Sequence, residues 1–322
     1  MKFEKLCLCV AILGAAIAIH AETGPAPEVF APGVISGPGG DGSPSFTPDG
    51  NTLFFTRSAA RWSAILESHR VGDQWSKPTL ASFSGEWPDS SPAVSADGSF
   101  IVFASTHRTG ETGPNGQPKS ASHLWRVDRQ GAGWGTPHEL PATVNFCPTI
   151  FRPSLATDGS LYFTAAEEGK ELHLFRSLYR NGAYLKAEAL TFSNGTVKDV
   201  DPEIAPDQSF VIFSSRRWPG DQEHEHLYIA YSRNGEWGGL TPLRYAGDDD
   251  QGSSDDNDPR LGTDHHTLYF SSDRSVHAHF PRNRTQAEQD VNRMETWDNG
   301  NTSVWTLPIT PWMNPQANQQ KN

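Results

Sequence analysis

Acidic side chains recur shortly before a series of prolines, a spacing that could bring several carboxylates together. These are Asp41, Asp89, Asp199, Asp201, Asp256 and Asp258. Carboxylate and carbonyl oxygens are the ligands that Ca²⁺ prefers, so Asp199, Asp201, Asp256 and Asp258 are candidate metal ligands. The competing interpretation, favoured by the frequency of Asp in turns, is that each carboxylate caps backbone N–H groups nearby. Paired carboxylates could also cleave glycosides, but only at separations that the sequence does not fix.

Two His-x-His pairs form a second set of candidate metal ligands: His224 with His226, and His277 with His279. Alternate residues of a strand point to the same side, so each pair can present two imidazoles together, as zinc or manganese requires. The alternative is that all four are solvated loop histidines. The sequence contains neither a Gly-x-Ser-x-Gly elbow nor a phosphate-binding glycine loop.

Five tandem copies of one motif must position these side chains. Each copy has a proline, an apolar residue two positions later and an aspartate five positions later. The copies begin at Pro44, Pro92, Pro153, Pro202 and Pro259. An apolar segment follows in each copy and ends at Phe55, Phe103, Phe163, Phe213 or Phe270. Proline is tolerated at the start of a strand and Asp-Gly favours a tight turn, so each copy is predicted to begin with a β-hairpin.

Two further strands are predicted in each copy, and four antiparallel strands make one β-propeller blade. The predicted third strands cover 64–70, 123–128, 172–178, 227–232 and 303–307, and the fourth begin at Trp75, Trp134, Tyr184 and Trp237. The fifth copy lacks a fourth strand, which residues 28–35 would supply, removing two exposed sheet edges. We therefore expect an all-β chain with a single propeller of five four-stranded blades, closed by the N-terminal strand. The alternative is six blades.

The repeated motif, Pro-x-apolar-x-x-Asp-Gly with a closing Phe, resembles the TolB-like β-propeller repeat, a relative of WD40-like repeats. The resemblance extends from about Pro25 to Ile309. The Asn-Gly turns at 181 and 234 and the segment 297–300 before Trp305 look like those of exported bacterial propellers in that family. The resemblance implies a periplasmic module for protein interaction. Relatives include domains of peptidases and a metal-dependent pectin-fragment lyase, although no motif here matches the lyase residue by residue.

In such blades the connections between strands 1 and 2 and between strands 3 and 4 lie on one face of the disc, called here the turn face. Connections 2–3 and 4–1 lie on the opposite face, the loop face. The loop face has longer and more varied connections, which tend to carry function, so it is the predicted binding face. Its candidate ligand-binding residues are Arg57, Arg108, Arg216, Trp218 and Arg274. Trp218 is interpreted as an exposed aromatic that stacks on a sugar or peptide, or that covers a blade edge. Residues 285–295 are expected to form a helix over the channel mouth.

Charge and hydropathy exclude some partners. The 322 residues carry a net charge of −12, which excludes nucleic acid, because phosphate binding needs clustered Lys and Arg. Two lysines and an apolar run over 6–19 predict a signal peptide cleaved after Ala21. The run is too short to span a bilayer, and no second one follows, so membrane insertion is not expected. The predicted organisation is a signal peptide (1–21), a propeller domain (22–310) and a disordered tail (311–322), located in the periplasm or secreted.

These features predict an extracytoplasmic module that binds a protein or carbohydrate ligand through the loop face, without catalysis or an obligatory cofactor. The alternative is a metal-dependent polysaccharide lyase or hydrolase at the channel mouth, which would use calcium or a transition metal.

Overall fold

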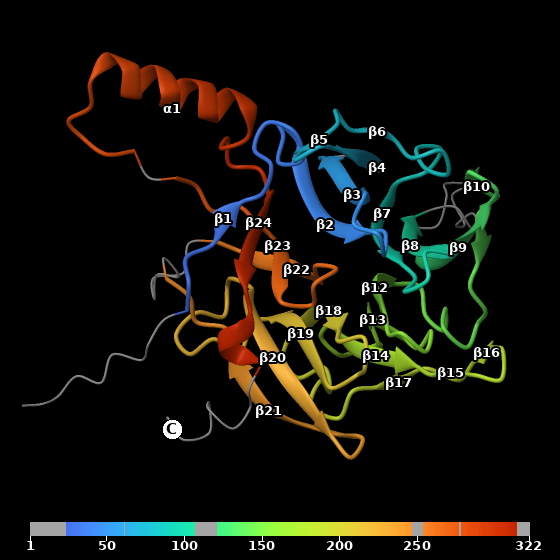
Figure 1. Cartoon of the computed structure of the whole chain (residues 1–322). Helices are drawn as coiled ribbons and strands as arrows, with labels where there is room; N and C mark the ends of the chain where they lie inside the picture. The colour runs from blue at the N-terminus through green and yellow to red at the C-terminus, as the bar shows by residue number, and fades with distance from the viewer. Residues whose placement is uncertain (1–23, 61, 107–120, 247–253, 277, 314–322) are drawn as a thin grey trace, which may run out of the picture.

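The computed structural model describes residues 24–60, 62–106, 121–246, 254–276 and 278–313. Five antiparallel sheets stand around a common axis (Figure 1). The prediction of an all-β, five-bladed propeller is therefore confirmed. Each proline of the repeat lies in the innermost strand of its blade, and the later strands of each copy follow outward.

The blades follow one another along the chain. Blade 1 contains β2 (Gly40–Phe46), β3 (Thr52–Ala59), β4 (Trp62–Val71), β5 (Gln74–Trp75) and β6 (Thr79–Leu80). Blade 2 contains β7 (Asp89–Val94), β8 (Phe100–Thr106), β9 (Ser122–Gln130), β10 (Gly133–Trp134) and β11 (His138–Glu139). Blade 3 contains β12 (Ile150–Leu155), β13 (Leu161–Ala165), β14 (His173–Ser177) and β17 (Glu188–Ala189), with the hairpin of β15 (Tyr179–Arg180) and β16 (Ala183–Tyr184). Blade 4 contains β18 (Asp199–Ile204), β19 (Phe210–Ser215), β20 (His226–Arg233) and β21 (Glu236–Pro242). Blade 5 contains β22 (Asp256–Leu261), β23 (Thr267–Ser272) and β24 (Ser303–Pro308), completed by β1 (Glu28–Val29).

The fourth strands of blades 1 and 2 are interrupted. In blade 1, β5 and β6 both pair with β4, and Pro78 lies between them; in blade 2, β10 and β11 both pair with β9, and Pro137 lies between them. Proline has no N–H to give to a sheet and is confined to edge positions. The fourth strands thus occur near the predicted aromatic residues, but as shorter pieces than expected.

The N-terminal strand closes the ring. Glu28 pairs with Thr306, and Val29 with Trp305. Beyond β1, the hydroxyl of Ser36 donates to the carbonyl of Val304 and accepts from its N–H, both at 3.0 Å. The predicted closure of blade 5 by residues 28–35 is confirmed for its strand, and no fourth strand from the C-terminal side is needed.

Apolar side chains fill the spaces between neighbouring blades. One cluster joins Phe54 of blade 1 to Phe103 of blade 2, and another joins Ile35 and Val304 of blade 5 to Phe55 of blade 1. Burial of such side chains contributes about 25 cal/mol per Å² of apolar surface. The core is thus distributed around the ring, and each blade depends on its two neighbours.

All five inner strands share a β-bulge at the repeat proline. Pairing with the second strand shifts register there in every blade. The residue before the proline has φ between 50° and 58° in each case: Ser43, Ser91, Arg152, Asp201 and Asp258. Non-glycine residues seldom adopt this left-handed conformation, and bulges re-aim side chains. Contacts among Ser43, Arg152 and Asp258, from three different blades, show that these side chains meet at the axis.

Two expectations require correction at the periphery. The helix α1 (Arg284–Thr296) forms where predicted, but it lies outside the ring beside blade 5 and not over the channel (Figure 1). It buries none of its residues, so no apolar stripe draws it onto the propeller. The disordered tail is expected from residue 311, but η1 (Thr310–Trp312) is packed, with Trp312 buried and its carbonyl accepting from the hydroxyl of Tyr231.

The predicted signal peptide, residues 1–21, lies outside the described residues, so its cleavage stays a prediction. No helix in the described part of the chain is long and apolar enough to cross a membrane.

Ring closure can be tested by Ile35→Ala, with Glu28→Ala as the matched control on the same segment. Ile35 is fully buried and Glu28 is exposed. We expect Ile35→Ala to lower the free energy of unfolding by about 2–4 kcal/mol, because it opens a cavity between the closing segment and blades 1 and 5. Glu28→Ala should change it by less than about 0.5 kcal/mol. Equal urea-denaturation midpoints for both variants would contradict an energetic role for the closing segment.

Candidate functional site

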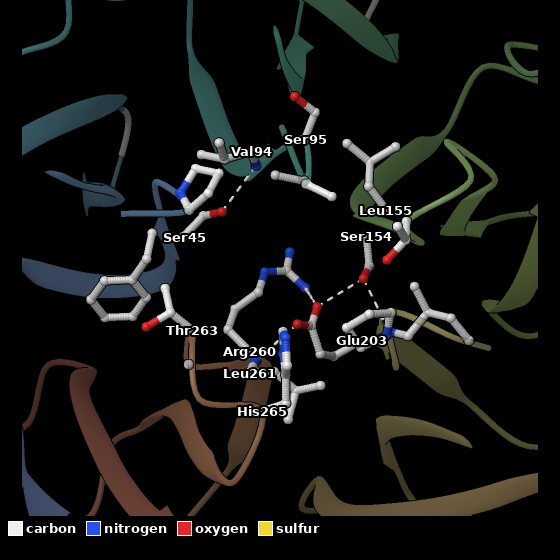
Figure 2. A pocket seen from close by; sticks show the side chains of 18 of the residues that line it. Ser45, Val94, Ser95, Ser154, Leu155, Glu203, Arg260, Leu261, Thr263 and His265 are labelled. Atoms are coloured by element: carbon white, nitrogen blue, oxygen red, sulfur yellow. Dashed lines mark hydrogen bonds and ion pairs between the residues drawn. The ribbon is translucent and has the colours of Figure 1, made fainter. Parts of the chain in front are cut away.

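A cavity of about 380 Å³ opens on the propeller axis at the turn face. We call it the axial cavity; inner strands and 1–2 turns of all five blades line it. Figure 2 shows its polar side chains, among them Ser45, Ser95, Ser154, Glu203, Arg260 and Thr263. The loop face, and not the turn face, is the face that the sequence predicts for binding. The prediction rests on the longer loops of the loop face. In the described residues, however, the axial cavity lies at the short turns of the opposite face.

The residue after each repeat proline lines the axial cavity. We call this ring of five residues the upper tier: Ser45, Ala93, Ser154, Glu203 and Arg260. Three of these side chains accept a hydrogen bond from the backbone N–H of the next blade. Ser45 accepts from Val94 at 3.0 Å. Ser154 accepts from Ile204 at 3.0 Å, and Glu203 from Leu261 at 2.8 Å. Side chains of the upper tier therefore link neighbouring blades. Ala93 and Arg260 do not make this hydrogen bond, because neither side chain has an acceptor atom.

Glu203 is the only carboxylate among the residues that line the axial cavity. Besides the Leu261 N–H, it accepts from the hydroxyl of Ser154 at 2.8 Å and lies 3.3 Å from Nη1 of Arg260. Burial raises the pKa of Glu203, against the lowering effect of the Arg260 charge and of these hydrogen bonds. Its oxygens are thus already engaged by the protein.

Arg260 is held on the axis by backbone carbonyls. Its Nη1 donates to Pro202 and Pro259 at 3.3 and 3.2 Å, and its Nη2 donates to Pro153 at 3.0 Å. The residue is only 3% exposed, and its Nε–H has no acceptor among the described residues. Figure 2 shows the guanidinium pointing into the middle of the cavity.

The residue before each proline forms a lower tier: Ser43, Ser91, Arg152, Asp201 and Asp258. Arg152 pairs with Asp258, lies 3.4 Å from Asp201 and donates to Ser43 at 2.5 Å. Burial raises the pKa of Asp201 to about 7, with Arg152 acting to lower it and Asp258 to raise it. The two aspartates predicted as calcium ligands, Asp201 and Asp258, are therefore both in contact with the guanidinium of Arg152 from blade 3, and calcium binding by them stays a prediction.

The remaining acidic residues of the repeat also pair with arginines. Arg57 donates to Asp41 through Nε at 2.6 Å and Nη2 at 3.1 Å. In the same way Arg217 pairs with Asp199, and Arg274 with Asp256. In blades 1, 4 and 5 these bonds join the start of the inner strand to the end of the second strand or the residues just after it. Asp199 and Asp256 thus have arginine partners within the protein, and metal binding by them and ligand binding by Arg57 and Arg274 stay predictions.

A sequence signal for this pairing exists. Arg217 and Arg274 each lie four residues after the Phe that ends strand 2, so their recurrence in register with the Asp marks them as partners. Asp89 of blade 2 accepts from Ser84 at 2.9 Å and from Ser105 at 2.6 Å.

His224 and His226 do lie together, as their spacing predicts, but on a carboxylate of their own loop. Nδ1 of His224 and Nε2 of His226 lie 3.0 and 3.1 Å from Oδ2 of Asp221. Although burial acts the other way, bonds from His226, His224 and the backbone lower the pKa of Asp221 to about 2. Within the described ranges, no three His, Cys, Asp or Glu side chains are arranged to hold a metal ion.

The other predicted residues are dispersed. Trp218 is buried and stacks on His226 at 4.5 Å, so the interpretation of Trp218 as an exposed stacking platform is wrong. Arg216 is partly exposed, 3.7 Å from Glu225, and His279 is exposed. Arg108 and His277 lie outside the described residues, so their roles stay predictions.

A second cavity of about 420 Å³ adjoins the first between blades 2 and 3. The two share Ser95, Ala96, Leu155 and Thr157 in their linings. Phe100, Arg126, Tyr179 and Tyr184 line the outer part of this second cavity. Together the cavities form a groove that runs from the axis toward the outer strands on the turn face, which repeat spacing alone did not indicate.

Comparison with known proteins supports the fold. No family model and no curated protein matches the sequence. Among solved structures, Bacteroides ovatus Xyloglucan PUL GH43B has a TM-score of 0.51 at 12% identity, over 88% of this chain and 54% of that chain. TolB from Acinetobacter baumannii has a TM-score of 0.46 at 14% identity, over 84% of this chain and 55% of that chain. A Dyadobacter fermentans protein of unknown function has 0.46 at 12% identity, over 87% and 96%. The chain spans about half the length of the first two, and at such identities the similarity shows the fold alone.

The lower tier predicts a pH-dependent effect of Arg152→Met. The substitution leaves two buried carboxylates without their cation, at a cost of about 3–5 kcal/mol. An Asp whose pKa is raised by folding contributes stability at low pH that is lost as the pH rises through about 7. Removal of Arg152 enlarges this loss, so urea denaturation should show greater destabilisation at pH 8 than at pH 5. The triple variant Arg152→Met, Asp201→Asn, Asp258→Asn should recover most of it, and a destabilisation independent of pH would count against the ion triad.

Proposed function

We propose that the protein is an extracytoplasmic binding module, secreted or periplasmic, and that its ligand is a polypeptide segment held in the axial cavity. The observation that carries the proposal is a cavity built by all five blades and lined by aliphatic and proline residues together with hydroxyl-bearing residues, one carboxylate, one guanidinium and one imidazole. Ligand sites are concave, largely apolar and equipped with few polar groups that fix orientation. The cavity volume of about 380 Å³ lies within the usual range for such sites.

The chemistry of the lining favours binding over catalysis. Glycoside hydrolysis uses two carboxylates on either side of the scissile bond. Glu203 is the one carboxylate in the described lining of the axial cavity, and its oxygens accept from Leu261, Ser154 and Arg260. The second cavity adds Asp97, which accepts from Ser95 and Ser99, and Asp158, which accepts from Ser160 and Arg180. The lyase or hydrolase alternative also required a metal, and no suitable cluster occurs in the described part of the chain. No observation on the described residues favours the alternative.

A peptide suits the groove better than a glycan. The apolar lining of the axial cavity includes Pro44, Val94 and Leu155, and its one phenylalanine, Phe46, has its ring packed against Phe30, Trp75 and Tyr269. In the second cavity, the guanidinium of Arg126 lies 3.8 Å from the ring centre of Phe100, and Tyr184 is buried against Tyr179. The aromatic faces there are already covered. Two adjoining cavities with apolar and polar lining residues suit the mixed side chains of a peptide segment.

Ala96→Trp tests the site. Ala96 is exposed and belongs to both linings, so a tryptophan there fills the groove without disturbing the core. The matched control is Val71→Trp, at an exposed position in the 3–4 turn of blade 1 on the same face and outside both linings. Peptides selected from a displayed random library against the wild type should bind Ala96→Trp about tenfold more weakly or worse, and Val71→Trp unchanged. Isothermal titration calorimetry measures both.

Two outcomes would overturn the proposal. One is that selected peptides bind Ala96→Trp as tightly as the wild type, which places the binding face elsewhere. The other is that no peptide is selected while an array of oligosaccharides binds in a manner that Ala96→Trp abolishes.

A further inference from the structure

We propose that Arg260 is a carboxylate-binding subsite of the axial cavity, which anchors the peptide ligand by its C-terminal carboxylate or by an acidic side chain. The inference rests on the proposed function and specifies the chemistry of its ligand. Its basis is a guanidinium on the axis that is almost fully buried, points into the cavity and retains a donor without an acceptor among the described residues.

The unused donor lies on the edge of the guanidinium that binds carboxylates elsewhere in this chain. Arg57 uses Nε and Nη2 together to hold both oxygens of Asp41. Arg217 holds Asp199 through the same two nitrogens. In Arg260 the Nε–H has no acceptor within the described ranges and Nη2 has one, the carbonyl of Pro153. A planar guanidinium presents this edge to a carboxylate in a two-pronged contact.

Most of the groups that hold the guanidinium of Arg260 in place are uncharged. Three of its four hydrogen-bond acceptors are neutral backbone carbonyls. The fourth, Glu203, is 3.3 Å away and is held independently by Leu261 and Ser154. Burial raises the pKa of Glu203, while the charge of Arg260 acts to lower it. A buried donor left unpaired costs free energy, and a ligand carboxylate that reaches Nη2 and draws Nε–H into the same contact removes that cost.

In the repeat, Arg260 lacks the bond to the next blade that three of its equivalents make, and its own bonds run to Pro202 of blade 4 and Pro153 of blade 3. At the equivalent position Ser45, Ser154 and Glu203 accept a hydrogen bond from the next blade. Arginine has donors only, so blade 5 gives up that bond to blade 1. Ala93 gives up the same bond in blade 2 but brings no polar group, whereas Arg260 places a guanidinium in the cavity lining.

Charges on the turn face indicate which residues of the peptide ligand should lie beside its anchoring carboxylate. Each 1–2 turn carries one aspartate: Asp49, Asp97, Asp158, Asp207 and Asp264. Hydrogen bonds from turn hydroxyls and backbone hold the pKa values of Asp49, Asp97 and Asp207 below the ordinary range. Burial acts in the opposite direction at Asp158 and Asp264, and their hydrogen bonds outweigh its effect on the pKa. A guanidinium in the cavity, surrounded by turns that each carry an aspartate, complements a peptide with a carboxylate at the anchor and basic residues beside it.

Ligand variants test the subsite without altering the fold. Peptides selected on the wild type, and displaced by Ala96→Trp, are made as the free acid, as the C-terminal amide, and with each Asp or Glu changed to Asn or Gln. We expect one of these neutral forms to bind the wild type about tenfold more weakly. If amidation weakens binding, the anchor is the C-terminus; if an Asn or Gln change does, it is a side chain.

Protein variants then assign the contact. Arg260→Gln should bind the acidic and neutral forms with equal affinity, and Arg260→Lys should retain part of the difference. The matched control is Arg129→Gln, at an exposed arginine at the end of β9 outside both linings. This variant should retain the whole difference in affinity between the acidic and neutral peptides. The ¹⁵N resonance of Arg260 Nε should shift on addition of the acidic peptide and not of its neutral form, which a purely structural arginine would not show.

The outcomes separate the two proposals. If the neutral forms bind the wild type as tightly as the acidic form, yet Ala96→Trp still blocks them, the carboxylate subsite is overturned and the peptide function stands. The subsite is overturned in the same way if Arg129→Gln and not Arg260→Gln removes the difference in affinity. If no selected peptide is sensitive to Ala96→Trp, the proposed function fails and the subsite fails with it.

Discussion

The β-bulge at each repeat proline is the constraint on which the rest of the structure depends. It holds a non-glycine residue at positive φ in all five inner strands, a conformation that costs roughly 1–3 kcal/mol per residue and survives only where the surroundings enforce it. The residues on either side of the proline are two positions apart and would share a side in a regular strand as well; the bulge shifts the pairing register between them. Side chains of both tiers reach the axis, where they contact other blades. The chain thereby gains two rings of five positions that can be varied independently of the blade cores.

The two tiers show different solutions to burying charge. In the lower tier, Arg152 spans the axis to contact Ser43, Asp201 and Asp258 on three other blades, so its charge is met by two carboxylates of the protein. In the upper tier, Arg260 and Glu203 each bond mainly to backbone or to a neighbouring hydroxyl. The guanidinium of the lower tier is thus neutralised within the ring, whereas that of the upper tier points into the axial cavity and keeps one N–H without an acceptor among the described residues.

Sequence reasoning predicted most of the fold because the repeat encodes local and nearest-neighbour interactions. Prolines, Asp-Gly turns and the closing Phe recur at fixed spacing, and so determine strand order, blade number and the need for a closing strand. It failed where the partner comes from another loop. Asp199 pairs with Arg217, and Asp256 pairs with Arg274. Aspartates that the sequence suggested as metal ligands therefore form ion pairs with arginines that follow the second strand. Burial of Trp218 against His226 likewise depends on packing that a single segment does not reveal.

The positions where the copies disagree were the better guide to the site. Arg152 interrupts the acidic series in the third copy, and Arg260 interrupts the hydrogen-bond acceptors in the fifth. In a closed ring held by packing between blades, each copy meets the same structural demands, so a residue that departs from them either compensates for a neighbour or faces something outside the ring. Arg152 compensates for its neighbours, because it forms ion pairs with Asp201 and Asp258. Arg260 is of the second kind, a residue that faces something outside the ring, since its Nε–H finds no acceptor within the described chain. That difference favours binding at the turn face, despite the longer loops opposite.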